Sequence, residues 1–455
     1  MAPKFGTSGL RGLVVELTDD LVADHVRAFL ATCDTGGRLW VGRDLRPSSP
    51  DIARVVAETA VAEGAEVILA GALPTPALAL AAQGAGAVMV TGSHIPADRN
   101  GLKFYTRAGE ITKTDEAAIT AALGRAPAGG APGRLRQDPD AGARFVARYV
   151  AGFGPGALAG RRIGAYAHSA VGRDLLAQVL SALGAVVVDL ARSDIFIPVD
   201  TEAVDPDTRA QLARWASQHA LDAIVSTDGD SDRPMLTDET GRVVAGDVLG
   251  QITAELLGAD TVVTPISSNS GVTRKPCFGR VIRTRIGSPF VIAGMESAGG
   301  RVAGYEANGG FLLGFDARGP AGAIAALPTR DSFLPILAML VAAGSGPVSA
   351  RVAAEPAVFT AADRLAELPE TAMRDLVGAM AADRAARARF LSGCGAVEAG
   401  LDLTDGVRMT AADGRVLHVR PSGNAPELRL YVEAADPATA EATLARGLAH
   451  LATLL

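Results

Sequence analysis

Cysteine is scarce in this sequence, which has three in 455 residues: Cys33, Cys277 and Cys394. They lie far apart and match neither a zinc-site spacing nor a disulfide framework, which argues against a metal–thiolate centre and against a disulfide-stabilised secreted domain. We expect each of them to pack as a small apolar side chain in a protein of the reducing cytoplasm.

An excess of basic residues is also missing, since 43 Lys and Arg face 50 Asp and Glu for a net charge of −7. Such a chain has no overall positive field for nucleic acid or an anionic membrane, so any anion must be bound by a local basic pocket. We therefore expect small-molecule partners, no nucleic acid and no membrane. The sequence assigns no oligomeric state.

Long hydrophobic runs are absent as well. The longest uncharged stretch, residues 67–97, is interrupted by Pro74, Pro76, Gly84 and Gly86. The resulting pieces are shorter than the roughly 20 residues that a membrane-spanning helix needs. The first 12 residues carry Lys4 and Arg11 with no apolar run between them, unlike a signal peptide. These patterns predict a soluble, cytoplasmic protein.

The length predicts several domains, because single cores rarely grow beyond about 250–300 residues. A strand–helix–strand pattern spans residues 38–71, with Ser49 expected as the helix N-cap. It returns over residues 161–191 and, more loosely, over 259–306. Unbroken apolar strands of this kind are covered on both faces, so we predict three related α/β domains with mixed or largely parallel sheets.

The C-terminal part has a different pattern. "GRVLHVRPSGNAPELRLYVEA" indicates strand, loop and strand, and an amphipathic helix follows it. This arrangement predicts a smaller α+β domain. Gly- and Pro-rich or turn-forming stretches separate the units. The predicted domains are residues 1–135, 136–242, 243–346 and 347–455.

A cluster of carboxylates follows the apolar strand before "DGDSDR". Asp228, Asp230 and Asp232 repel one another unless a cation neutralises them, and their oxygen atoms suit Mg²⁺ or Ca²⁺. A solvated acidic turn and a phosphatase with an aspartate nucleophile are alternatives that this motif alone leaves open. An EF-hand is disfavoured, because Arg233 stands where that loop needs glycine.

"TGSHIPADRNGLKF" places Ser93 where another apolar strand ends. A hydroxyl at such a position can act as a nucleophile or carry a phosphoryl group. A serine hydrolase would require G-x-S-x-G, but Ile95 stands in place of the second glycine.

Two further loops carry polar groups suited to a sugar phosphate. "RPSGNAPELR" supplies guanidinium, hydroxyl and exposed N–H donors without an acidic side chain at its tip, as a phosphate cradle requires. "GYEANGG" places Glu306 and Asn308 on a glycine-flanked loop, and such side chains suit sugar hydroxyls.

Together and in this order, the motifs resemble those of the α-D-phosphohexomutases, the phosphomannomutase and phosphoglucomutase family. "KFGTSGLRG" is similar to the family's N-terminal motif, "TGSHIPADRNGLKF" to its phosphoserine loop and "DGDSDR" to its metal loop. "GYEANGG" and "RPSGNAPELR" are similar to its sugar-recognition and phosphate-binding loops. The resemblance covers essentially the whole chain, and five ordered motifs are far more specific than any one of them.

The resemblance implies a central cleft between four domains and a serine that is phosphorylated in the resting enzyme. Ser93 would donate the phosphoryl group and, with the three aspartates, would hold Mg²⁺. His94 or Lys103 would assist proton transfer. The remaining groups near the reaction centre would be Arg11, Lys103 and Arg233, with Ser8 close by.

The implied reaction interconverts hexose 6-phosphate and hexose 1-phosphate through a hexose 1,6-bisphosphate, which is both intermediate and activator. Glu306 and Asn308 would hold the ring hydroxyls. A phosphomannomutase, with mannose phosphate as its substrate, is the expected enzyme, and a phosphoglucomutase or a phosphoacetylglucosamine mutase is the alternative. A phosphatase and a non-catalytic sugar-phosphate-binding protein are more distant alternatives. The phosphate that is not reacting would be held by Arg420, Ser422, Gly423, Asn424 and Arg429.

The sequence also departs from the family pattern. Ile95 replaces the usual asparagine, and Ser231 replaces the usual glycine of the metal loop. Gly310 and Ser288 stand where histidines are common. None of these changes removes a required ligand, but the loss of two histidines near the ring leaves the sugar preference and the proton-transfer route open.

Overall fold

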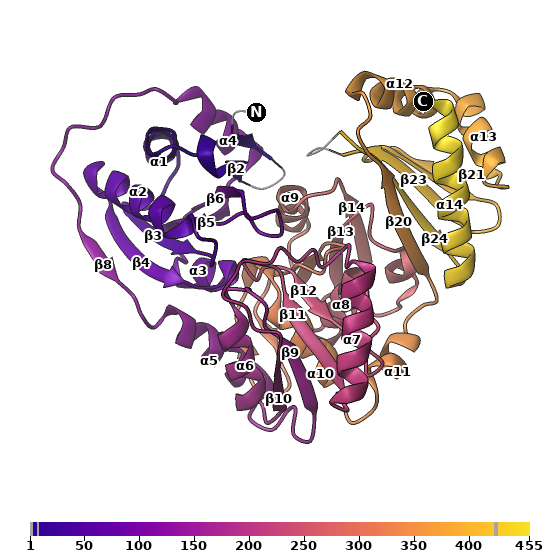
Figure 1. Ribbon diagram of the computed structural model, residues 1–455, viewed down its shortest axis with the longest axis horizontal. Helices are drawn as coiled ribbons and strands as arrows, with labels where there is room; N and C mark the ends of the chain where they lie inside the picture. Colours follow the sequence, from indigo (N-terminus) through magenta and orange to yellow (C-terminus); the bar gives the residue numbers. More distant parts are fainter. Residues whose placement is uncertain (1–2, 7–8, 423–425) are drawn as a thin grey trace.

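The computed structural model describes residues 3–6, 9–422 and 426–455. Within these residues the chain forms four successive units, each built on one main β-sheet. Figure 1 shows the first and fourth units on opposite sides of the second and third. The first three sheets are mixed and the fourth is antiparallel, which confirms the predicted fold class of three α/β domains followed by an α+β domain.

The first sheet has the strand order β1-β2-β6-β5-β3-β4-β8, and the short β7 pairs with β6. β5, β3, β4 and β8 are parallel neighbours, whereas β6 runs antiparallel beside β5. The strands are β1 (Lys4–Phe5), β2 (Leu10–Leu13), β3 (Arg38–Arg43), β4 (Glu66–Ala72), β5 (Gly86–Val90), β6 (Arg99–Thr106), β7 (Gly109–Glu110) and β8 (Leu135–Gln137). The helices are η1 (Val14–Glu16), α1 (Asp19–Thr32), α2 (Ser49–Ala62), α3 (Thr75–Ala81) and α4 (Lys113–Ala121).

The second sheet has the order β10-β9-β11-β12, and the third has the order β14-β13-β15-β16-β19 beside the hairpin β17-β18. The elements of the second unit are α5 (Ala141–Phe153), β9 (Arg162–Tyr166), α6 (Arg173–Ala182), β10 (Val186–Leu190), α7 (Pro206–Gln218), β11 (Ala223–Thr227) and β12 (Pro234–Leu236). The elements of the third are α8 (Gly246–Leu256), β13 (Thr261–Pro265), η2 (Ser270–Arg274), β14 (Arg280–Thr284), α9 (Ser288–Ala298), β15 (Val302–Tyr305), β16 (Phe311–Leu313), β17 (Ala317–Arg318), β18 (Ala323–Ile324), β19 (Leu327–Asp331), α10 (Phe333–Ala342) and α11 (Val348–Ala353).

The fourth sheet is a five-stranded antiparallel sheet with the order β20-β24-β23-β22-β21. Its strands are β20 (Phe359–Leu365), β21 (Glu398–Asp402), β22 (Val407–Ala411), β23 (Val416–Pro421) and β24 (Leu428–Ala434). Its helices are α12 (Glu370–Ala382), α13 (Arg384–Gly393) and the closing α14 (Pro437–Leu454).

One connection recurs in all three α/β units. In each unit one strand has a parallel neighbour on one side and an antiparallel neighbour on the other. These strands are β5, β11 and β15, and their antiparallel neighbours are β6, β12 and β16, respectively. The loops that join these pairs carry Ser93, the three aspartates and Glu306, respectively. Loops at the carboxyl ends of parallel strands are the usual place for a site in such sheets. Repetition of the unit therefore supplies three of the predicted site loops.

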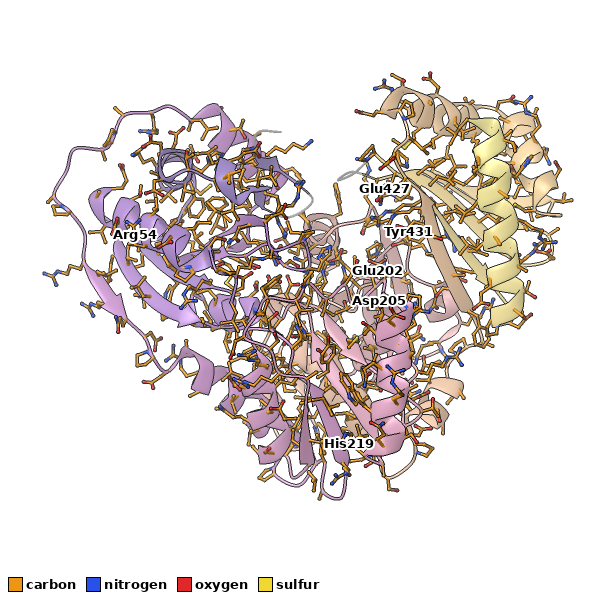
Figure 2. All side chains as sticks on the ribbon, viewed as in Figure 1. Arg54, Glu202, Asp205, His219, Glu427 and Tyr431 are labelled. Atoms are coloured by element: carbon orange, nitrogen blue, oxygen red, sulfur yellow. The ribbon has the colours of Figure 1, made fainter. Side chains whose placement is uncertain are left out.

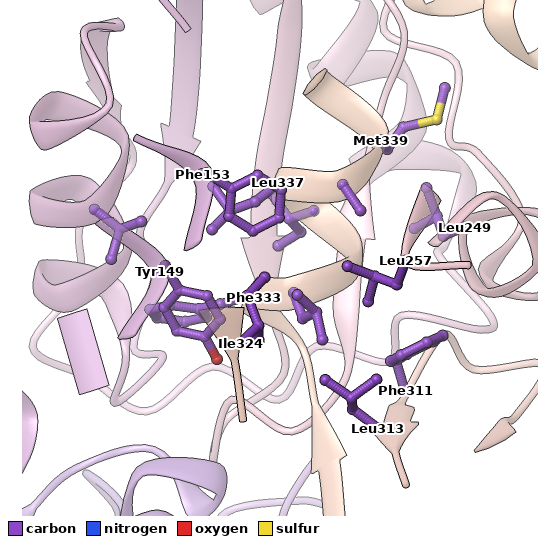
Figure 3. Packing of buried hydrophobic residues seen from close by; sticks show 14 of the residues in the cluster. Tyr149, Phe153, Leu249, Leu257, Phe311, Leu313, Ile324, Phe333, Leu337 and Met339 are labelled. Carbon is purple, nitrogen blue, oxygen red and sulfur yellow. The ribbon is translucent and has the colours of Figure 1, made fainter. Parts of the chain in front are cut away.

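One apolar cluster includes residues of the first three units, each of these units also has a separate cluster, and the fourth unit has its own. Helix α10 is buried from Phe333 to Leu340, and Phe333 packs against Tyr149 of α5 with ring centroids 5.8 Å apart (Figure 3). A helix that is apolar all round belongs in such an interior. None of the helices in the described part of the chain has both the length and the apolar character needed to cross a membrane.

Two local predictions need correction. Ser48, and not Ser49, is the N-cap of α2. Ser49 is the first helical residue, and its hydroxyl donates a hydrogen bond of 2.5 Å to the buried carboxylate of Asp44. Cys33 and Cys394 are buried in apolar clusters as expected. Cys277 is exposed, so the packing prediction is wrong for that residue.

Candidate active site

Ser93 lies just beyond β5, whose five residues are all buried. Its backbone has a φ of +54°, in the left-handed region that non-glycine residues seldom adopt. Its N–H donates to the Thr91 hydroxyl at 2.7 Å, and its carbonyl accepts from Arg46 at 2.8 Å. A side chain at Gly92 would come within 2.5 Å of the Arg46 guanidinium, so glycine is needed there. The loop therefore holds Ser93 in one strained conformation.

The Ser93 hydroxyl reaches across to the metal loop of the second unit. It donates to Asp228 Oδ2 at 2.6 Å and lies 3.2 Å from His94 Nδ1. Asp228 Oδ1 accepts from the N–H groups of Asp232 and Arg233 at 3.1 and 3.2 Å. Burial, followed by the charge of Asp230, raises the pKa of Asp228 well above its usual range. The loop thus fixes this carboxylate beside the serine oxygen.

The three aspartates of this loop are buried and converge on one point. Each of them offers a carboxylate oxygen that lies within 4.8 Å of the other two. Asp230 Oδ1 and Asp232 Oδ1 are buried and have no hydrogen-bond partner among the described residues. Unpartnered buried carboxylate oxygens are costly unless a cation binds them, and hard oxygen ligands suit Mg²⁺. The residues present therefore fit a divalent metal.

Lys103 supplies positive charge to the same loop. Its Nζ lies 2.5 Å from Asp230 Oδ2 and 2.5 Å from Asp232 Oδ2. Burial opposes ionisation of Asp230, but Lys103 outweighs it and lowers the pKa of that carboxyl. Asp230 also accepts from the Thr75 hydroxyl at 2.6 Å. The first unit therefore contributes both the serine and a neutralising cation.

Ser231 explains how this loop tolerates the loss of the usual glycine. Its φ is +58°, which glycine adopts without strain. Its hydroxyl accepts from the Gly172 N–H at 2.9 Å and from the Thr227 hydroxyl at 2.8 Å. These hydrogen bonds offset the cost of the left-handed backbone.

The structure brings the other predicted cations to the same place. Arg11 donates to the Gly92 carbonyl at 2.5 Å, and burial lowers its pKa to about 10. The Nε of Arg233 lies 3.9 Å from Asp232 Oδ1. Burial, followed by the charge of Arg233, lowers the pKa of His94 to about 3, so its imidazole is neutral at pH 7.

Two site residues that we did not predict organise these loops. Arg46 is fully buried and donates to the carbonyls of Ser93, Ile95, Pro96 and Arg99. Its charge is balanced by Asp44 at 3.2 Å. Arg330, the second, lies 2.8 Å from Asp232 and 3.2 Å from Glu306, and it joins the metal loop to the sugar-recognition loop.

The loop predicted to bind sugar hydroxyls follows β15. Glu306 and Asn308 are both buried, and Asn308 Oδ1 accepts from the Gly310 N–H at 3.0 Å. This bond within the loop shapes the turn. Glu306 has an ion pair to Arg330 through Oε2, whereas its Oε1 has no hydrogen bond recorded among the described residues.

The loop predicted to bind phosphate belongs to the fourth unit. Arg420 of β23 and Arg429 of β24 lie directly opposite each other in the antiparallel pair. Like charges in this position destabilise a sheet unless an anion lies between them. Arg420 lies 3.4 Å from Asp405, and Arg429 donates to Glu427 at 3.2 Å. The Nε atoms of both arginines are buried and have no hydrogen-bond partner among the described residues, so the pair fits an anion site.

The second unit faces this arginine pair. Glu202 interacts electrostatically with Arg429, and Figure 2 shows Glu202 on the side of the second unit toward Glu427 and Tyr431. The Ser422 N–H donates to the Glu427 carbonyl at 2.8 Å. The predicted residues Ser8, Gly423 and Asn424 lie outside the described residues.

Comparison with known proteins agrees with this geometry over the whole chain. Residues 2–128, 147–241 and 237–359 match the alpha/beta/alpha domains I, II and III of phosphoglucomutase/phosphomannomutase, and residues 364–449 match its C-terminal domain. The chain is 46% identical to the phosphomannomutase of Sinorhizobium fredii over 99% of both chains. It is 41% identical to that of Salmonella muenchen, over 94% of this chain and 91% of the other.

Solved structures agree in fold. A phosphoglucomutase/phosphomannomutase family protein from Burkholderia thailandensis superposes with a TM-score of 0.80 at 20% identity, over 100% of this chain and 98% of the other. The four matched domains span nearly the whole sequence. The chain therefore belongs to the phosphoglucomutase/phosphomannomutase family, the α-D-phosphohexomutases, and is an enzyme of the intramolecular phosphotransferase class.

Proposed function

We propose that this phosphohexomutase interconverts mannose 6-phosphate and mannose 1-phosphate through a phosphorylated Ser93 and a mannose 1,6-bisphosphate. The observation that carries the proposal is the hydrogen bond of 2.6 Å from the Ser93 hydroxyl to Asp228, beside two further buried aspartates. A serine oxygen next to a candidate metal site is placed to accept and return a phosphoryl group. In this mechanism Ser93 transfers its phosphoryl group to the free hydroxyl of the hexose monophosphate.

Charge stabilisation is the main task of the protein in such a transfer. Lys103, Arg11 and Arg233 surround the serine and the aspartates with positive charge. Bound Mg²⁺, held by the three aspartates and Ser93, would add a Lewis acid for the transferring phosphoryl oxygens. His94 Nδ1, at 3.2 Å from Ser93 Oγ, is close enough to exchange a proton with that oxygen.

The second phosphate must be held away from Ser93 while the first reacts. Arg420 and Arg429 form a cationic pair on neighbouring strands and fit that role. Because the bisphosphate must present each phosphate to Ser93 in turn, this pair accepts both orientations of the sugar. Glu306 and Asn308 would bind the ring hydroxyls.

Mannose is favoured because the relatives from Sinorhizobium fredii and Salmonella muenchen, at 46% and 41% identity, are both named phosphomannomutase. Glucose phosphate is the second candidate. The two sugars differ in the direction of one hydroxyl group, which binding alone discriminates weakly.

The test compares Ser93→Ala with the wild type, with Mg²⁺ and a trace of mannose 1,6-bisphosphate. We expect phosphate on Ser93 by peptide mass spectrometry and a loss of kcat/KM of about 10³-fold or more in the variant. Ser392→Ala, at an exposed serine of α13, is the matched control and should keep wild-type turnover. Retained mutase activity in Ser93→Ala would contradict the mechanism.

The same assay separates the alternatives. Release of inorganic phosphate by an active Ser93→Ala enzyme would indicate a phosphatase, and hexose phosphate binding without turnover by the wild type would indicate a binding protein. Comparison of kcat/KM for the 1-phosphates of mannose, glucose and N-acetylglucosamine decides the sugar. We expect the highest value for mannose.

A further inference from the structure

Arg330, on β19, is the one described side chain that ion-pairs with both the metal loop and the sugar-recognition loop. Its Nε donates to Asp232 Oδ2 at 3.0 Å, and its Nη2 lies 2.8 Å from the same oxygen. Its Nη1 donates to Glu306 Oε2 at 3.2 Å. All three side chains are buried. A single guanidinium therefore connects the second and third units at the centre of the site.

Gly310 explains how this arginine is accommodated. A Cβ atom at Gly310 would lie 2.7 Å from Arg330 Cδ and 2.9 Å from Cγ, closer than real Cβ contacts allow. Gly309 has a left-handed φ of +86°, but Gly310 is not among the residues with positive φ. Glycine at 310 is therefore required by the packing of Arg330 and not by the backbone conformation.

In this arrangement the two oxygen atoms of each carboxylate differ in their contacts. Glu306 Oε2 is engaged by Arg330, which leaves Oε1 as the oxygen that can accept from a ligand. Asp232 Oδ2 is shared by Arg330 and Lys103, and its Oδ1, which lies 3.9 Å from Arg233 Nε, has no hydrogen-bond partner among the residues that the structure describes. A cation bound by Asp232 competes with Arg330 for the charge of that carboxylate. The N–H groups of Arg330 that a cation displaces from Asp232 can donate to Glu306 or to a ligand oxygen instead, because a guanidinium has five N–H donors.

We infer that Arg330 is a positioning residue that couples metal binding at Asp232 to hexose phosphate binding at Glu306. Since coupling between two sites is reciprocal, Mg²⁺ and hexose phosphate increase each other's affinity by the same factor. This inference rests on the proposed function, because it takes the aspartates as the metal site and Glu306 as a sugar ligand.

The test measures binding and not turnover. In a Ser93→Ala background, which cannot carry the phosphoryl group, calorimetry gives the Kd of mannose 1-phosphate with and without Mg²⁺. We expect Mg²⁺ to lower that Kd at least about fivefold, and mannose 1-phosphate to lower the Kd of Mg²⁺ by the same factor. In Arg330→Gln the factor should fall to near one in both directions. Arg330→Lys should lose most of the coupling factor, because one ammonium group cannot replace the several N–H donors of the guanidinium.

Gly310→Ala provides a second variant that keeps the arginine and its charge. It should displace Arg330 and reduce the coupling factor, whereas adding it to Arg330→Ala should change little, because alanine lacks the Cγ and Cδ atoms that clash. Arg318→Gln, at an exposed arginine of β17, is the matched control and should keep the full factor. Circular dichroism of each variant checks that it is folded.

The outcomes separate this inference from the function on which it rests. An unchanged coupling factor in folded Arg330→Gln and Gly310→Ala overturns the inference and leaves the mutase proposal standing. Full turnover by Ser93→Ala, measured separately, overturns the mutase mechanism. Equal effects of Gly310→Ala with and without Arg330 would also contradict the inference, since the glycine would then serve the loop and not the arginine.

Discussion

The Ser93 hydroxyl donates a hydrogen bond of 2.6 Å to the carboxylate of Asp228, although 135 residues separate the two in the chain. The contact joins the first unit to the second and places the serine oxygen at the edge of the aspartate cluster. A cation held by the aspartates would favour the ionised form of Asp228, and hydrogen bonds to ionised acceptors are about twice as strong as neutral ones.

Asp228→Asn should therefore remove both the charge and a metal ligand while keeping the shape of the side chain. We expect the Kd for Mg²⁺ to rise by about 100-fold or more, since even residues that only support a ligand cost 10- to 100-fold. Calorimetry with Mg²⁺ measures this. Asp260→Asn, at an exposed aspartate, is the control, and a Kd equal to that of the wild type in Asp228→Asn would argue against a metal site at this loop.

A second prediction concerns Arg46, because its guanidinium donates hydrogen bonds to carbonyl groups of the serine loop. Arg46→Lys keeps the charge beside Asp44 but cannot donate to four carbonyls at once. We expect kcat to fall at least about tenfold with a smaller change in KM. Steady-state kinetics with Arg54→Lys, at an exposed arginine of α2, as the control checks it; an unchanged kcat would mean that the loop keeps its shape without this arginine.

At Ser231 we predict that a glycine variant is more stable than an alanine variant. Ser231→Gly relieves the strain at a φ of +58° and loses two hydrogen bonds, so these effects oppose each other and the free energy of unfolding should change by less than about 1 kcal/mol. Ser231→Ala keeps the strain and loses the same bonds, so it should destabilise by about 1–3 kcal/mol. Urea unfolding of the pair gives the order, and the opposite order would show that strain contributes little.

Asp247 predicts a pH-dependent gain in stability. It is buried at the start of α8, and its Oδ1 has no partner in the described residues. Burial raises its pKa to about 6. The neutral carboxyl group of Asp247 therefore favours the folded state. This contribution to stability is fully present below the unfolded pKa, near 4, and is lost as the pH rises through 6.

Asp247→Asn should consequently stabilise the protein by about 1–3 kcal/mol at pH 7.5, and by about 1 kcal/mol less at pH 5. The amide oxygen can still accept from the Asn269 N–H, which now donates to Asp247 at 2.8 Å. Denaturant unfolding at the two pH values measures the difference. A gain of equal size at both values would show that its cause is packing and not charge.

The sequence was sufficient to predict those parts of the candidate site that are local in the chain. Ser93 and the three aspartates follow apolar strands, and strand ends with polar loops can be recognised from a few residues. The repeated β–α–β pattern predicted the first three units for the same reason. Helix ends are less certain, as the shift of the α2 N-cap by one residue shows.

Arg46 and Arg330 could not be predicted, because their partners are distant in sequence. Arg46 binds carbonyls about 50 residues away, and Arg330 binds Asp232, 98 residues before it. Each follows or ends a strand, and the glycine at 310 was a visible departure from the family pattern. These signals become informative only when the sheet topology shows which loops share an edge.

Strand β8 has a consequence for dissecting the molecule. It pairs with β4 after the chain has run along the outside of the first unit (Figure 1). A fragment that ends before residue 135 would leave one flank of β4 with unpaired backbone groups, which favour strand-to-strand aggregation. The segment before α5 thus covers the edge of β4, and an N-terminal fragment that folds on its own has to include this segment.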